Sequence, residues 1–510
     1  MIHAFKRIGV VGAGAMGRGI VQLFASSGIA VRLYDSRPDA IDEALTFNRG
    51  LLERAHTRGK LDDASLALAL DCMTPAPMLD DLADCDLVIE AIVENLEAKQ
   101  GLFRELEARV GPTAVLASNT SSLSVSRIAS GCRYPGRVAG LHFFNPVPLM
   151  KVVEVVCGAR TETDVIQRLV ALVEQAGHFA AQVPDSPGFL VNHAGRAYGP
   201  EALRILSEGI ATPQQIDRIL RDSLGFPMGP FELFDLMGLD VSHSVMESVH
   251  EQFYQDPRYT PSALVPPRLA AGLLGRKSGE GFYRYMDGKP VPDEPAEVPT
   301  IALERPFWLD CEDAGMRAQI GALLGAAGAV LETGEAASAQ AICVVTPLGE
   351  DASSLIARKR LPARRTLALD TFAGFDRRRV LMRQPALAPQ VLAQARQAFG
   401  ADGVPVEVIN DSPGFIAQRV LAGIVNLGCE IAQRRIADPA TLDRAVELAL
   451  GYPQGPLRCG DNFGPERIMR ILHHLHELYQ DPRYRVSPWL RRRVQLGLPL
   501  ITPEQTETLQ

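Results

Sequence analysis

Residues 7–28, RIGVVGAGAMGRGIVQLFASSG, decide how the N-terminal part of the chain folds. An apolar strand, a glycine-rich turn and a helix follow one another there, and VRLYD (31–35) comes next as a second strand. Later apolar runs, CDLVIEAI (85–92), TAVLAS (113–118) and RVAGLHFF (137–144), alternate with helical patterns. This alternation is typical of a doubly wound α/β domain around a parallel sheet. We predict that domain over residues 1–184, because QVPDSPGF (182–189) then breaks the pattern.

The glycines of the turn fit the G-x-G-x-x-G pattern of dinucleotide-binding sites. Gly12 would make the tight turn, Gly14 would let a pyrophosphate approach the helix N-terminus, and Gly17 would let helix and strand pack closely. Asp35 follows the second strand, where it can accept hydrogen bonds from ribose hydroxyls and repel a 2′-phosphate, although a simple turn role would also suit it. The sequence therefore predicts NAD rather than NADP as cofactor. Arg37 is the one nearby feature that would suit a 2′-phosphate.

Composition excludes several classes of protein. The chain has 510 residues, 46% hydrophobic and 22% charged, and a formal charge of −8, which fits a globular protein of several domains with no basic field for nucleic acid or a membrane surface. The eight cysteines are scattered, so we expect reduced thiols in the cytoplasm. The strand pattern leaves no room for a signal peptide, and the longest apolar run is too short to span a bilayer. HHLH (473–476) lacks partners at ligand spacing, so we expect no metal site.

The C-terminal half repeats part of the N-terminal half. DSPGF (185–189) recurs at 411–415, 226 positions later, and residues 208–230 align without gaps on residues 434–456 at the same offset. QDPRY (255–259) recurs at 480–484. We therefore predict a helical domain at 185–286, a proline-rich linker at 287–306, a reduced α/β domain without a glycine fingerprint at 307–409, and a second helical domain at 410–510.

A histidine and a glutamate stand close together in LHFFNPVPLMKVVEVV (141–156). Strand alternation places Glu154 on one face with valines, and a carboxylate there is costly unless it has a partner. Glu154 could lie in water on an edge strand. The alternative is a pair with His142 at the carboxyl end of a neighbouring strand, where open α/β sheets bind ligands. Oxidation of an alcohol needs a base and a group that orients it, and this pair would supply both.

Five stretches carry more specific motifs: ASNTSSLSVSRIA (117–129), GLHFFNPVPLMKVVEVV (140–156), DSPGFLVN (185–192), GFPMGPFELFDLMGLD (225–240) and GRKSGEGFYRY (275–285). They resemble the L-3-hydroxyacyl-CoA dehydrogenase family, and the resemblance spans residues 1–285. It implies a Rossmann domain plus an all-helical domain like that of 6-phosphogluconate dehydrogenase, followed here by a degenerate second copy. It also implies NAD-linked oxidation of an (S)-3-hydroxyacyl-CoA to the 3-oxoacyl-CoA.

The resemblance also implies roles for individual residues. His142 would be the base and Glu154 its orienting partner, Ser121 and Asn192 would hold the oxygens of the substrate, Asn145 would order the pocket, and Glu94 and Lys99 would contact the nicotinamide end of the cofactor. From the residues alone, Ser121 would also suit a helix N-cap and Asn192 a helix surface. His193 stands where the family usually carries arginine.

The second copy lacks these residues. Gln418 aligns with Asn192, and no H-F-F-N-P follows residue 300, so we expect it to be catalytically silent. The layout resembles the long bacterial enzymes of phenylacetate breakdown, whose substrate would be 3-hydroxyadipyl-CoA. Because short family members dimerise through their helical domains, the chain could form a homodimer, or a monomer in which the second helical domain replaces the dimer partner.

Substrate contacts and competing functions complete the predictions. Arg54, Arg58 and Lys60 could receive the phosphates of coenzyme A, although a solvated helix face is an equal explanation. Arg196, one helical turn after Asn192, could receive a distal carboxylate. Alternative functions are a 3-hydroxybutyryl-CoA dehydrogenase, a role in fatty acid β-oxidation, a gulonate-type dehydrogenase, and a non-enzymatic protein of the same fold, as lens crystallins are. Phe143 after the histidine, where the gulonate type favours proline, argues against that type.

Overall fold

The structure is a computed structural model that describes residues 5–292 and 301–504. The chain forms two compact units, unit 1 with residues 1–193 and 434–450 and unit 2 with residues 194–433 and 451–510. Part of the predicted linker, residues 293–300, lies outside the described residues.

Unit 1 contains an eight-stranded sheet with the order β3-β2-β1-β4-β5-β6-β7-β8. Its strands are β1 (Arg7–Val11), β2 (Ala30–Tyr34), β3 (Met73–Pro75), β4 (Leu87–Glu90), β5 (Val115–Ser118), β6 (Val138–Phe143), β7 (Val152–Cys157) and β8 (Phe179–Pro184). Neighbours are parallel except β6 and β7, which are antiparallel. The prediction of a parallel sheet is therefore wrong at this pair, because residues 144–151 are too few for a crossover connection.

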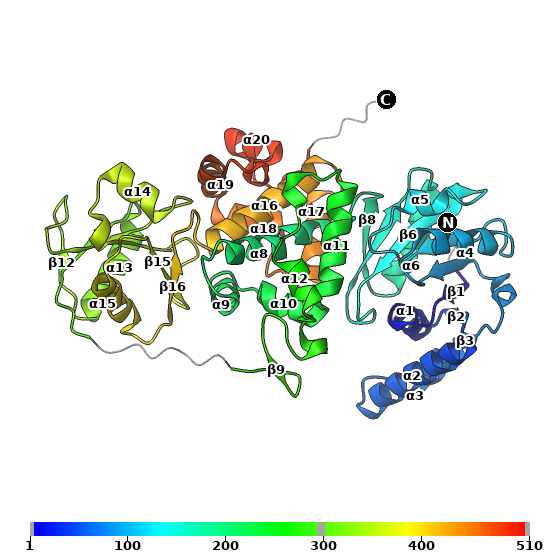
Figure 1. The fold of residues 1–510 in the computed structure, drawn as a ribbon. Coiled ribbons are helices and arrows are strands. Elements are labelled where there is room, and N and C mark those ends of the chain that lie inside the picture. Colours follow the sequence, from blue (N-terminus) through cyan, green and yellow to red (C-terminus); the bar gives the residue numbers. More distant parts are fainter. Residues whose placement is uncertain (1–4, 293–300, 505–510) are drawn as a thin grey trace. The chain divides into compact units, whose positions relative to one another are not determined.

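Helices cover both faces of this sheet. They are α1 (Ala15–Ser26), α2 (Pro38–Thr57), α3 (Asp63–Asp71), α4 (Leu96–Glu107), α5 (Val125–Ala129) and α6 (Thr163–Gln175), with short 3₁₀ turns at Leu79–Leu82 and Pro135–Arg137. One buried apolar cluster joins α1, α2 and α6 to the sheet, and a second cluster joins α4 and α5 to its other face. In Figure 1, α2 and α3 lie side by side at one end of the unit. This is the predicted doubly wound arrangement.

A helix from the C-terminal repeat completes unit 1. α17 (Pro439–Leu450) packs on β7 and on β8, the last strand of the sheet. A last strand leaves one row of backbone groups unpaired, and a covering helix limits its pairing with other chains. α7 (Val191–Ala194) lies at the boundary of the two units.

Unit 2 begins with the first helical copy. Its elements are α8 (Gly199–Ser207), α9 (Pro213–Leu224), α10 (Pro230–Met237), α11 (Leu239–Gln252), α12 (Val265–Ala270), 3₁₀ turns at Gly195–Ala197, Pro257–Tyr259 (η4) and Arg276–Ser278, and a hairpin of β9 (Tyr285–Met286) and β10 (Lys289–Pro290). The local sequence explains α9. Thr212 and Gln215 form a capping box at its start, Pro213 opens the first turn, and Gly225 ends the helix at φ +76°.

A second, six-stranded sheet follows with the order β12-β11-β13-β14-β15-β16. Its elements are β11 (Phe307–Asp310), α13 (Ala314–Ala326), β12 (Leu331–Glu332), β13 (Ile342–Val345), α14 (Ala352–Lys359), a 3₁₀ turn at Ala363–Arg365, β14 (Thr366–Leu369), β15 (Arg379–Arg383), α15 (Pro389–Gly400) and β16 (Val406–Asn410). Only β14 and β15 are antiparallel. The repeat extends to the local contacts, because Asp185 accepts hydrogen bonds at the start of α5 as Asp411 does at the start of α14.

The second helical copy closes unit 2. It comprises α16 (Ala417–Gln433), α18 (Pro456–Phe463), α19 (Pro465–Tyr479), a 3₁₀ turn at Pro482–Tyr484 (η7) and α20 (Pro488–Leu496). α16 is the centre of the helical part of unit 2, because it packs against α8, α9, α18, α19 and α20 (Figure 1). The duplication predicted from the sequence is therefore present in the fold.

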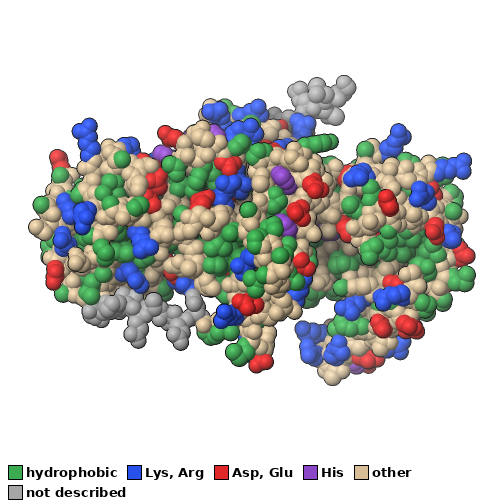
Figure 2. All heavy atoms as spheres, in the orientation of Figure 1, with side chains coloured by type: hydrophobic (Ala, Val, Ile, Leu, Met, Phe, Trp, Pro, Cys, Tyr) green, Lys and Arg blue, Asp and Glu red, His purple; other side chains and the backbone are tan. Residues whose placement is uncertain are grey.

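Three further features of the described residues concern surface charge, the character of the helices and the cysteines. Figure 2 shows acidic and basic side chains interspersed over the visible face of each unit. Within residues 5–292 and 301–504, none of the helices combines the length and apolar character needed to cross a bilayer. The cysteines in those residues are free thiols.

Candidate functional site

The glycine-rich turn joins β1 to α1. Gly12 has φ +107°, and a Cβ there would lie 2.5 Å from the carbonyl oxygen of Ala91. A Cβ on Gly17 would overlap the carbonyl oxygen of Gly12, so the helix and the turn approach as closely as their backbones allow. A Cβ added to Gly14, in contrast, would meet no other part of the chain within 4 Å. The two outer glycines are thus required by the fold, and the middle one leaves room for a ligand.

A groove of about 620 Å³ opens beside this turn. Gly12, Gly14, Asp35 and Arg37 line it together with the residues that follow β4 and residues of α4. Asp35 follows β2, with its side chain 15% exposed, and it accepts hydrogen bonds from Ala13 N (2.8 Å) and Arg37 N (3.0 Å). An open cradle at a helix N-terminus, with an acid at its far end, fits the pyrophosphate and ribose of a dinucleotide.

The predicted pair of His142 and Glu154 lies further along the same sheet, on β6 and β7. The two residues are direct partners in the antiparallel register, and Nδ1 of His142 is 2.6 Å from Oε2 of Glu154. Glu154 is fully buried and His142 is 5% exposed, so the edge-strand alternative is wrong. Because a carboxylate only accepts, Nδ1 carries a proton and Nε2 is left as the acceptor of a substrate proton. The rings of Phe144 and Phe189 flank the imidazole at 4.4 and 5.9 Å between centroids.

The second oxygen of Glu154 ties the pair to the residues that precede Asn192. Oε1 accepts the backbone N–H groups of Leu190 and Val191, both at 2.8 Å. Nδ2 of Asn192 in turn donates to the carbonyl oxygen of Ser121 at 3.1 Å. The structure therefore brings together the four predicted catalytic residues, through hydrogen bonds and the peptide bond between Val191 and Asn192. Three backbone segments supply them, one after β5, one on β6 and β7, and one after β8.

Glu94 and Lys99 belong to a polar network that contacts the serine loop, residues 119–124 after β5. Glu94 accepts hydrogen bonds from Thr120 Oγ1 (2.6 Å) and from the backbone N–H groups of Ser121 and Ser122 (3.0 Å each). Burial alone would raise the pKa of Glu94, but the Lys99 ammonium and the hydroxyl donors outweigh it and hold that pKa below its ordinary value. Glu94 therefore fixes the backbone of Ser121.

Glu90, which sequence reasoning missed, completes that network. Lys99 is only 1% exposed, with Nζ 2.5 Å from Glu90 and 3.2 Å from Glu94. Ser118 Oγ and Ile92 N also donate to the fully buried Glu90, each at 2.7 Å. The signal was present, because Glu90 is a carboxylate in an apolar strand, as Glu154 is. Asn119, also missed, accepts from Phe143 N at 2.8 Å and so ties the end of β6 to the serine loop.

The remaining predicted residues lie outside these contacts. Asn145 is exposed in the loop after β6, and Arg54, Arg58 and Lys60 are exposed at the end of α2. Arg196 belongs to unit 2, where it lines an enclosed cavity with Glu201, and burial lowers its pKa to about 10. Their roles stay predictions. Across the described residues, no group of three His, Cys, Asp or Glu side chains is arranged to hold a metal ion.

Comparison with known proteins decides the family. Residues 7–186 match the model described as 3-hydroxyacyl-CoA dehydrogenase, NAD binding domain, and residues 188–285 and 414–500 match the model of the C-terminal domain of the same family. The chain belongs to the 3-hydroxyacyl-CoA dehydrogenase family. The two C-terminal matches agree with the duplicated helical domain, and the first match gives NAD as the cofactor of this oxidoreductase.

Relatives match this dehydrogenase in two ways. Some cover both copies: a 3-hydroxyadipyl-CoA dehydrogenase of Escherichia coli K12 is 36% identical over 97% of this chain and 99% of its own. The crystal structure of a 3-hydroxybutyryl-CoA dehydrogenase from Escherichia coli K12 has a TM-score of 0.82 and 34% identity, and covers 97% of this chain and 99% of its own. Others cover the first copy: a probable 3-hydroxybutyryl-CoA dehydrogenase of Deinococcus radiodurans is 41% identical over 55% of this chain and 100% of its own.

Proposed function

We propose that this dehydrogenase oxidises 3-hydroxyadipyl-CoA to 3-oxoadipyl-CoA in phenylacetate catabolism, with His142 as its base. The contact of 2.6 Å between His142 and Glu154 is the observation that supports the chemistry. The substrate is supported by a relative named 3-hydroxyadipyl-CoA dehydrogenase, which is similar over 97% of the chain and so includes the second copy. A second candidate substrate is 3-hydroxybutyryl-CoA, because the similar full-length crystal structure carries that name. A role in fatty acid β-oxidation would use the same chemistry.

The reaction divides the alcohol's two hydrogens between two acceptors. Nε2 of His142 takes the hydroxyl proton while the Nδ1–H group donates to Glu154. The buried carboxylate of Glu154 fixes this tautomer and stabilises the imidazolium that forms. NAD, held by the glycine turn and Asp35, would supply the acceptor for the hydride of the carbinol carbon. In the reverse direction the imidazolium returns the proton to the 3-oxo group.

Two further side chains position the substrate in this proposal. Ser121 and Asn192 hold the hydroxyl or carbonyl oxygens of the acyl chain. Support comes from the backbone bonds that fix both segments, Glu94 to Ser121 N at 3.0 Å and Glu154 to Val191 N at 2.8 Å. Rigid donors near a reacting carbonyl stabilise the charge that develops on its oxygen. Arg54, Arg58 and Lys60 would hold the phosphates of coenzyme A.

The second copy is silent in this proposal. At the offset of 226 positions, Val380 stands in place of Glu154, so no carboxylate is available there. Gln418, in place of Asn192, is buried and uses its amide internally, donating to Asp370 at 2.9 Å and accepting from Gly349 N at 2.7 Å. Its role is instead that of a dimer partner within the same chain. We further propose a cytoplasmic enzyme, in agreement with the scattered free cysteines.

A substrate panel tests the proposed function. NADH or NADPH consumption is measured with acetoacetyl-CoA, a long-chain 3-oxoacyl-CoA and 3-oxoadipyl-CoA, and NADH formation is measured with NAD and a free hydroxy acid such as gulonate. The proposal expects turnover with NADH, the highest kcat/KM with 3-oxoadipyl-CoA, and no reaction of the free acid. A preference for acetoacetyl-CoA would favour the second candidate, and reaction of the free acid alone would reject both.

Arg196 gives a sharper test of the dicarboxylic substrate. If its guanidinium receives the distal carboxylate, Arg196→Ala lowers kcat/KM for 3-oxoadipyl-CoA about tenfold or more relative to acetoacetyl-CoA. An unchanged ratio between the two substrates removes this role from Arg196.

A further inference from the structure

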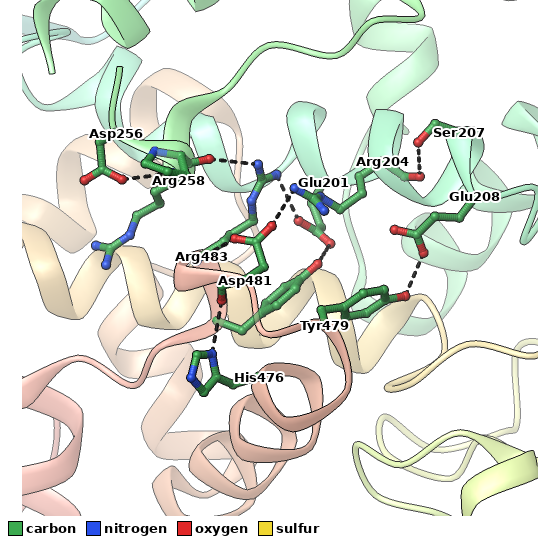
Figure 3. A network of polar contacts seen from close by, with 12 residues as sticks. Glu201, Arg204, Ser207, Glu208, Asp256, Arg258, His476, Tyr479, Asp481 and Arg483 are labelled. Atoms are coloured by element: carbon green, nitrogen blue, oxygen red, sulfur yellow. Dashed lines mark hydrogen bonds and ion pairs between the residues drawn. The ribbon is translucent and has the colours of Figure 1, made fainter. Parts of the chain in front are cut away.

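A buried polar network joins the two helical copies inside unit 2. Its centre is Arg419 on α16, whose side chain is fully buried. Nε donates to Glu201 at 2.5 Å, and the two terminal nitrogens donate to the two oxygens of Glu208 at 2.7 and 2.8 Å. Tyr479 donates to Glu208 (Figure 3), at 2.7 Å between oxygens. Tyr484 donates to Glu201 at 2.6 Å. Glu201 and Glu208 belong to the first copy, and the other three residues belong to the second.

Further ion pairs cross between the same two copies. Arg204 of α8 forms an ion pair with Asp481 (Figure 3). The nitrogen and oxygen of this pair are 2.8 Å apart. Arg258 is 3.3 Å from Glu430, both with side chains 7% exposed. Burial alone would raise the pKa of Glu201. The guanidinium groups of Arg419 and Arg483 outweigh that effect and hold the pKa of Glu201 below its ordinary value. The described acids and bases of this interface therefore face each other across the two copies.

Equivalent positions of the repeat meet at this interface. η4 contacts η7, its own counterpart in the repeat. The lining of the small cavity between the copies includes pairs of counterparts, namely Arg258 with Arg483, Tyr259 with Tyr484, and Ala197 with Gly423. Contact between equivalent surfaces is the geometry of a two-fold dimer interface.

The charges at this interface, however, are not equivalent. At the offset of 226 positions, Arg419 corresponds to His193, Glu201 to Leu427, Glu208 to Arg434, and Glu430 to Arg204. Two first copies paired in this way would leave the buried Glu201 and the partly exposed Glu208 of each without the fork of Arg419, and would place Arg258 against Arg204. Two second copies would place the buried Arg419 against a leucine and another arginine. Among the described ion pairs named above, the pairing of unlike copies places each acid against a base.

We propose that this surface of the catalytic copy is built to take one partner, the second copy of the same chain, and to reject another catalytic copy. Buried charges left without partners are strongly unfavourable, so like pairing is excluded by the same residues that stabilise unlike pairing. The second copy thus lacks the catalytic residues and carries charges complementary to those of the catalytic copy. This inference concerns stability and assembly and does not rest on the proposed substrate or base.

An exchange of helices supports the same pairing. In unit 2, α9 of the first copy contacts β16, the last strand of the second sheet. Glu407 on β16 accepts hydrogen bonds from Gln215 Nε2 at 3.1 Å and from Arg218 Nε at 2.8 Å. In unit 1, α17 of the second copy packs on β8, the last strand of the first sheet. α9 and α17 are counterparts in the repeat, so each copy covers the edge of the other's sheet. A copy alone would leave such an edge exposed.

A double-variant cycle in the full-length chain tests the proposal. Arg419→Met and Glu201→Leu each leave a buried charge without its partner, and each is expected to lower the melting temperature by about 5 °C or more. The combined variant removes both charges and is expected to regain at least half of the larger loss. The control is Arg284→Met, whose side chain is 80% exposed beside Glu280, and it should leave the melting temperature unchanged. Single variants that melt like the parent, or additive losses in the double variant, would overturn the proposal.

A second variant covers the case in which Arg419→Met does not fold. Glu430→Arg places at this position the residue that the first copy carries, facing Arg258, and it is expected to lower the melting temperature more than Glu430→Gln does. Light scattering on every folded variant is expected to give the particle mass of the parent, because the surface is occupied within one chain. A particle mass that changes with Glu430→Arg or Arg419→Met would mean that the surface joins separate chains, and would overturn the proposal.

Discussion

His142 and Glu154 face each other across the antiparallel strands β6 and β7, with Nδ1 of the imidazole 2.6 Å from Oε2 of the carboxylate. The other oxygen of Glu154 accepts Leu190 N and Val191 N. One buried carboxylate therefore orients the ring and also holds the segment that carries Asn192. Because no solvent reaches Glu154, its negative charge is stabilised by these donors alone, which makes the pair sensitive to any change in either residue.

Glu154→Gln should abolish most of the turnover. The amide oxygen can replace one acceptor but cannot supply the charge that stabilises the imidazolium, so kcat is expected to fall about 10²–10⁴-fold. Steady-state kinetics with NADH and the preferred 3-oxoacyl-CoA measure this, and Glu97→Gln on the exposed face of α4 is the control. A kcat equal to that of the control would mean that the carboxylate does not support the imidazole.

Gly14→Ala and Gly17→Ala should separate binding from folding. Gly14 has φ −65° and no neighbour within 4 Å of an added Cβ, so Gly14→Ala should melt like the parent but bind NADH at least about tenfold more weakly. An added Cβ on Gly17 overlaps the carbonyl oxygen of Gly12, so that variant should lose stability as well. Thermal melting and fluorescence titration with NADH measure the two effects. Parental affinity in Gly14→Ala would argue against the pyrophosphate at this turn.

Lys99→Met should destabilise unit 1 and weaken catalysis. It leaves Glu90 fully buried without its ammonium partner, for an expected loss of about 3–5 kcal/mol in the free energy of unfolding. Adding Glu90→Gln should restore part of that stability, because it removes the unpaired charge. Urea unfolding followed by circular dichroism gives both values. Equal stability of Lys99→Met and the parent would contradict the role assigned to this network.

The stability supplied by Glu201 should depend on pH with a definite sign. Its pKa is lowered in the folded chain from an ordinary value of 4.5, because Arg419 and Arg483 outweigh the opposing effect of burial. A carboxylate with a lowered folded pKa contributes stability above its unfolded pKa and loses it as the pH falls through the folded value. The melting temperature of the parent should therefore exceed that of Glu201→Gln fully at pH 7, and the difference should shrink below about pH 4.5. A difference that grows on acidification has the wrong sign for this account.

Local patterns predicted much of the fold and of the site. The glycine turn, the alternation of strands and helices in the first copy and the buried partner of His142 follow from short-range rules, because a carboxylate inside a valine strand needs a partner nearby. Glu90 obeys the same rule and could have been found in the same way. The antiparallel direction of β7 could have been inferred from the short connection before it.

Contacts between distant parts of the chain were beyond those rules. Arg419 meets Glu201 across 218 positions, and α17 reaches β8 from the C-terminal quarter of the chain. Periodicity describes which face of a helix is buried but not which element covers it. The alignment of the two repeats gave equivalent positions, while the complementary charges between them became visible only when the two copies were seen in contact.

The turnover of full-length His142→Gln tests the central claim most directly. If this imidazole is the base and the second copy is silent, kcat with NADH and the preferred 3-oxoacyl-CoA falls at least about 10²-fold, while the affinity for NADH stays that of the parent. If the variant keeps a kcat within about threefold of the parent with unchanged NADH affinity, His142 is not the proton-transfer group and the account is contradicted.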